Sequence, residues 1–93
     1  MQLELHIKNE GTPRDCHRCA VAMAFLRAGA TEATVFSTEA MLTWQGQTMH
    51  CSWLPEEIQD VIWEFDQGIP FEPFTVVIEA EPWESLSGLV LAV

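Results

Sequence analysis

The sequence predicts a single α+β domain, residues 1–93, in which two helices pack on a mainly antiparallel sheet of four to five strands. The chain is short and 48% hydrophobic, which suits one compact core. Apolar residues alternate with polar ones in several short segments, as in half-buried strands, and follow a helical period in two others. The resulting order is β-α-β-β-β-α-β, and consecutive short strands joined by turns favour antiparallel pairing.

The first strand and the first helix are predicted from the N-terminal third of the chain. A strand is expected at residues 3–7, where apolar and polar side chains alternate. A helix is expected to begin at Thr12-Pro13, because threonine is a good N-cap and proline is favoured in the first turn. Gly29 is expected to end this helix, since glycine is common directly after a helix.

Three further strands are predicted in the middle of the chain. Short polar turns separate them, and they cover residues 33–36, 40–44 and 47–53. In the last of these strands, the two-residue period places Met49, Cys51 and Trp53 on one face.

A second helix is expected to start at Pro55 and to end at Gly68. Glu56 and Glu57 would lie in its first turn, where the helix dipole favours anions. Its apolar stripe would consist of Ile58, Val61, Ile62 and Phe65.

The C-terminal part of the domain is predicted to form a last strand at residues 74–80 and a tail at residues 81–93. The tail is acidic at first and then apolar, with high β-propensity at its end. We expect it to add a strand to a sheet edge or to make the contact of a homodimer.

Charge is distributed unevenly along the chain. The formal net charge is −10, and residues 31–93 contain eleven acidic side chains but no lysine or arginine. An acidic protein repels nucleic acids and anionic membranes and attracts basic proteins. We therefore expect a basic protein partner, no direct nucleic-acid partner and no membrane partner. No apolar run reaches the length of a membrane helix, and no secretion signal is recognised, so a cytoplasmic location is expected.

The second predicted helix also contains the best candidate for a binding surface. Acidic residues cover the side opposite the apolar stripe, and a tryptophan points outward among them. Tryptophan is enriched in binding hot spots and attracts cations, so this surface suits a partner that presents arginines. The alternative is that the acids only keep the helix solvated. The candidate partner-binding residues are Glu56, Glu57, Asp60, Trp63 and Glu64, together with Trp83, which also has acidic neighbours.

Cys16 and Cys19 form a Cys-x-x-Cys motif near the start of the first predicted helix, where thiol pKa values fall. With His50 and Cys51 they would supply four ligands to zinc. However, both cysteines fit one stripe of the predicted helix, and cysteine is among the most often buried residues. Core packing of all three cysteines is therefore preferred, without metal or cofactor. A small zinc- or thiol-dependent protein that uses Cys16, Cys19 and Cys51 remains the alternative.

No recognised catalytic motif occurs in the sequence. It contains neither a Gly-x-Ser-x-Gly elbow nor a phosphate-binding glycine loop. His6, His17 and His50 are predicted to be surface residues. We therefore expect a protein that is not an enzyme and has no catalytic residues.

Several short motifs resemble a family of small uncharacterised proteins of tailed phages and prophages. They lie within residues 1–80 and are Asp15-Cys16-x-x-Cys19-Ala20-Val21-Ala22, Leu54-Pro55, Phe65-Asp66-x-Gly68 and Glu72-Pro73-Phe74. The chain departs from the family pattern at Ala20, where the family has a proline after the second cysteine. The family has no known activity, so the resemblance assigns no site residues. It implies an accessory protein in the cytoplasm of a host cell that binds host machinery and inhibits a nucleic-acid-binding or defence complex.

Overall fold

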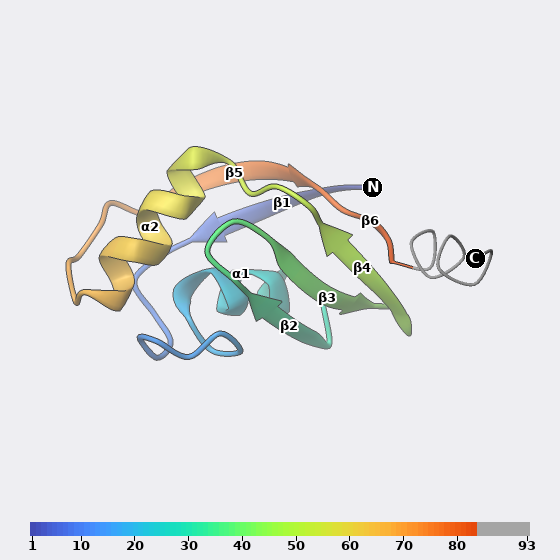
Figure 1. The fold of residues 1–93 in the computed structure, drawn as a ribbon, viewed down its shortest axis with the longest axis horizontal. Helices are drawn as coiled ribbons and strands as arrows, with labels where there is room; N and C mark the ends of the chain where they lie inside the picture. Colours follow the sequence, from blue (N-terminus) through green and yellow to red (C-terminus); the bar gives the residue numbers. More distant parts are fainter. Residues whose placement is uncertain (84–93) are drawn as a thin grey trace, which may run out of the picture.

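The structure, a computed structural model, describes residues 1–83. The elements in this part of the chain are β1 (Gln2–Ile7), α1 (Ala20–Ala28), β2 (Glu32–Val35), β3 (Ala40–Trp44), β4 (Gln47–Cys51), α2 (Glu56–Asp66), β5 (Phe74–Glu79) and β6 (Glu81–Pro82) (Figure 1). The predicted α+β class and the order β-α-β-β-β-α-β are confirmed, with β6 following at the end. The strand or dimer contact expected from the apolar end of the tail, residues 84–93, lies outside the described residues.

The strands form two antiparallel sheets, whereas a single sheet was expected. One sheet pairs β1 with β5, and the other has the order β2-β3-β4-β6. The two sheets are connected through Ala80, a fully buried residue between β5 and β6. The split arises because β5 pairs with β1 whereas β6 pairs with β4. The sequence pattern alone did not indicate this change of partner.

The core lies where α1 contacts both β1 and β2. Its largest fully buried side chains include Phe25 from α1, Leu5 from β1 and Ile58 from α2. Residues 3, 5 and 7 of β1 are buried while their neighbours are exposed, as the alternation predicted. Phe65 and Ile62 of α2 are partly buried against the core, which confirms the predicted stripe together with Ile58 and Val61.

Helix α1 begins later than predicted, at Ala20 instead of Pro13, and its N-cap is Cys19. The reason is local hydrogen bonding by Asp15, whose carboxylate accepts from the His17 N–H at 2.9 Å and whose carbonyl accepts from the Arg18 N–H at 3.1 Å. Aspartate competes in this way with helix formation. Gly29 ends the helix, as predicted.

Strand β4 is shorter than predicted and ends at Cys51. Met49 and Cys51 are buried, as expected, but Trp53 is 69% exposed instead of facing the core. The alternation stops because the Leu54 N–H donates to the Thr38 carbonyl at 2.8 Å and turns the chain toward α2. Helix α2 then starts directly after Pro55. Within residues 1–83, no helix combines the length and apolar character needed to span a membrane.

Candidate binding surfaces

Helix α2 presents a group of carboxylates that we call the acidic face, consisting of Glu56, Glu57, Asp60 and Glu64. The first three are exposed and Glu64 is half-buried. The ion pairs found in residues 1–83 involve Glu4, Glu10, Glu39 and Glu79 but no carboxylate of the acidic face. The charge of this face is therefore not compensated within the described part of the chain.

Trp63 lies next to the acidic face on the same helix. It follows Asp60 by three positions and Gln59 by four, so these side chains are its neighbours on the helix surface. Its side chain is 61% exposed, which leaves most of the indole ring available to a partner. Five of the six predicted site residues therefore lie on one surface of α2, where all except the half-buried Glu64 are exposed.

The first turn of α2 holds this surface in place. The N-cap is Pro55, which provides no side-chain cap, and the helix dipole there is complemented by Glu56 and Glu57. The Gln59 side-chain amide donates to the Leu54 carbonyl at 2.7 Å and so ties the helix to the preceding turn. Because Leu54 and Ile58 are fully buried, the acidic face is attached to the core.

Trp83, the sixth predicted site residue, is separated from the others. It follows β6, which lies at the opposite end of the molecule from α2 (Figure 1). Its ring packs edge-on against His50, with ring centroids 4.8 Å apart. The backbone N–H of Trp83 donates to the Thr48 carbonyl at 3.0 Å. Trp83 therefore helps to hold β6 on β4 and does not extend the acidic face.

His50 is half-buried, in contrast to the surface position predicted for it. Its Nε2 lies 2.8 Å from a carboxylate oxygen of Glu39, and only 15% of its side chain is accessible. The prediction failed because β6 covers this side of β4 with Trp83. His6 and His17 are exposed, as predicted.

The three cysteines occupy different environments. Cys19 and Cys51 are buried, as predicted, whereas Cys16 is exposed because it lies in the loop before α1 and not in a helix. Cys51 lies in β4, in the core. Among residues 1–83, no group of three or more histidine, cysteine or acidic side chains is placed to hold a metal ion. The zinc site considered from Cys16, Cys19 and Cys51 is therefore not assembled.

Burial of Cys51 should make the stability of the protein sensitive to alkaline pH. Burial raises the pKa of this thiol to about 12 from an ordinary value of 9.0. Below about pH 9 the Cys51 thiol is protonated in both the folded and the unfolded protein. Above about pH 9 the thiol ionises first in the unfolded protein, so unfolding is favoured as the pH rises toward 12. We expect the urea midpoint to fall between about pH 9 and about pH 11.

The Cys51→Ala variant should show a flatter profile over this range, and the slope that remains should come from Cys19, whose thiol pKa is also raised by burial. The chain has no tyrosine, whose phenol would otherwise ionise in the same pH range. Identical slopes for wild type and Cys51→Ala would contradict the assignment.

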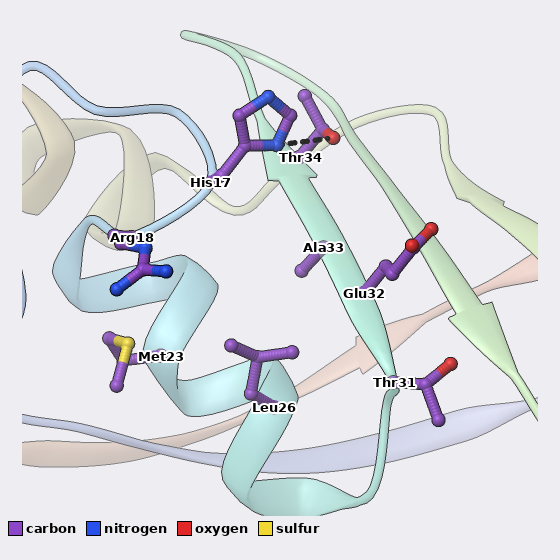
Figure 2. Close-up of a pocket in the computed structure, with 8 residues that line it drawn as sticks. All are labelled: His17, Arg18, Met23, Leu26, Thr31, Glu32, Ala33 and Thr34. Atoms are coloured by element: carbon purple, nitrogen blue, oxygen red, sulfur yellow. Dashed lines mark hydrogen bonds between the residues drawn. The ribbon is translucent and has the colours of Figure 1, made fainter.

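A groove of about 540 Å³ lies between α1, the loop before it and β2 (Figure 2). His17 and Thr34 close one end of it, with His17 Nδ1 and Thr34 Oγ1 3.1 Å apart. Arg18 lies on the helix side of the groove, between His17 and Met23 in the view (Figure 2). This groove was not predicted, because His17 and Arg18 were expected inside a helix and lie instead in the loop before α1. The lining residues are His17, Arg18, Met23, Leu26, Thr31, Glu32, Ala33 and Thr34.

No protein-family model matches the chain, and neither a curated protein nor a solved structure matches it. Its function is therefore inferred from its own surfaces.

Proposed function

We propose that the chain is a non-enzymatic acidic accessory protein that binds a basic surface of another protein through the acidic face and Trp63. The observation that supports this is a 61%-exposed tryptophan beside carboxylates without an ion pair in residues 1–83. Uncompensated charge increases the rate at which an oppositely charged partner is captured. The indole ring then offers a contact for a desolvated arginine.

The resemblance to phage proteins adds the proposal that this partner is a host protein in the host cytoplasm. A nucleic-acid-binding or defence complex has a basic groove that normally receives phosphates. The carboxylates of α2 would occupy such a groove and inhibit the complex. No activity of the chain itself is required for this mode of action.

Direct binding to DNA or RNA is not part of this proposal. Lys8 and Arg27 form ion pairs with Glu10, which reduces the positive potential that they offer to phosphates. Arg14 and Arg18 remain without an ion pair in residues 1–83. Two cations cannot offset a net charge of −10 against a phosphate backbone.

A matched pair of triple variants tests the acidic face. We expect Glu56→Gln, Glu57→Gln and Asp60→Asn together to weaken binding of a short arginine-rich peptide about tenfold, or about 1.4 kcal/mol. The control neutralises Glu32, Glu72 and Glu81, which are also exposed but lie on other parts of the fold. Both variants have the same net charge. The measurement is the dissociation constant at several salt concentrations, since screening weakens such contacts.

The control variant should change the dissociation constant by no more than about twofold, or about 0.4 kcal/mol. In the same titration, Trp63→Ala should weaken binding more than Trp53→Ala, although Trp53 is the more exposed of the two at 69%. Equal losses from both triple variants would mean that only net charge matters and would refute a specific surface on α2.

A further inference from the structure

The Cys-x-x-Cys motif lies on a loop that is held in one conformation by hydrogen bonds. The Thr12 N–H donates to the Arg18 carbonyl at 2.7 Å and closes the loop. The Cys16 carbonyl accepts from the Val35 N–H at 2.8 Å, which fixes Cys16 to the end of β2. A donor set held in place before its ligand arrives binds with a smaller entropic loss.

Cys16 and Cys19 line the same cleft. It has a volume of about 270 Å³ and lies between this loop, the end of β2 and helix α2. Cys16 is exposed there, while Cys19 is largely buried at the start of α1. One thiol is thus accessible to an incoming ion and the second lies deeper in the same cleft. The lining residues are Arg14, Asp15, Cys16, Cys19, Val35, Phe36, Ser37, Ile62 and Asp66.

The sulfur of Cys19 is held in a fixed position at the start of α1. This Sγ accepts from the Ala22 N–H at 3.4 Å, at the N-terminal end of α1 where the helix dipole is positive. A cation bound at this sulfur would give it a charged partner inside the cleft.

The number of ligands decides which metal suits the cleft. Zinc needs four ligands in a structural site, and residues 1–83 provide no group of three. Cu(I) is a soft ion that is selected by thiolates, and two thiolates satisfy it in a near-linear arrangement. We propose that Cys16 and Cys19 bind one Cu(I) ion. The ion binds as Cu(I) without a change of oxidation state, and the thiol protons are released to solvent.

The test is an anaerobic titration of the full chain with Cu(I) in competition with the coloured chelator bicinchoninate. We expect one Cu(I) per chain and a near-ultraviolet thiolate-to-copper absorption band. Cys16→Ser should lower the affinity at least about a hundredfold, since a hydroxyl is a poor ligand for a soft metal. Cys19→Ser should do the same while keeping the fold, because serine is a good N-cap.

Cys51→Ala is the matched control, since this thiol is buried in β4 and lies outside the cleft. It should bind Cu(I) with wild-type affinity and stoichiometry. The proposal is overturned if the wild type fails to compete with the chelator, if Cys16→Ser retains the affinity, or if binding requires Cys51. Circular dichroism of each variant separates loss of the site from loss of the fold. The outcome is independent of whether α2 binds a basic partner.

Discussion

Replacing Phe25 by alanine should lower the free energy of unfolding by about 3–5 kcal/mol. Phe25 is the largest of the fully buried side chains, with 0% exposure, and belongs to the helix that contacts β1 and β2. Its removal takes away apolar burial and leaves a cavity that the surrounding strands fill only in part. Since a domain of this size is stable by about 5–15 kcal/mol, the variant should lose a large part of its stability.

Urea denaturation followed by tryptophan fluorescence measures this loss. The matched control is Phe36→Ala, because Phe36 is the same residue type but is 47% exposed. The control should cost less than about 1 kcal/mol. Similar losses for the two variants would contradict the placement of Phe25 at the centre of the core.

Elements with a regular period were predictable from the sequence. Strand β1 alternates buried and exposed residues along its whole length, and the apolar stripe of α2 contacts the core as predicted. Both patterns arise because a strand or helix with one buried face repeats its environment at a fixed interval. For the same reason the outward side of α2, with Trp63, was predicted correctly.

Features that depend on contacts between distant residues were not predictable in this way. The start of α1 depends on the hydrogen bond between Cys16 and Val35 of β2, in addition to the local hydrogen bonds of Asp15. Trp83 has acidic neighbours in the sequence, as Trp63 has, but the pairing of β6 with β4 places it against His50. The cleft that contains both thiols forms only when this loop meets α2. None of these contacts leaves a periodic pattern in the sequence.

A side chain at Gly11 should strain the loop before α1. This residue has a φ of +90°, and a Cβ added to it would overlap the carbonyl oxygen of Arg18. That oxygen already accepts the Thr12 N–H at 2.7 Å, so it cannot move away without opening the loop. Gly11→Ala should therefore cost about 1–2 kcal/mol for the left-handed backbone. The overlap of the new Cβ with the Arg18 carbonyl should lower the free energy of unfolding by about 1–3 kcal/mol more.

Gly46→Ala is the control that measures only the cost of placing alanine in a left-handed backbone conformation. Gly46 also has a positive φ, of +80°, but no atom lies within 4 Å of an added Cβ. Urea denaturation should therefore show a smaller loss for Gly46→Ala than for Gly11→Ala, and equal losses would contradict the packing of Arg18 against Gly11. Because Cys16 and Cys19 lie on the loop that this contact closes, Gly11→Ala should also weaken Cu(I) binding. Gly46→Ala should leave the copper affinity unchanged, since Gly46 lies in the turn between β3 and β4.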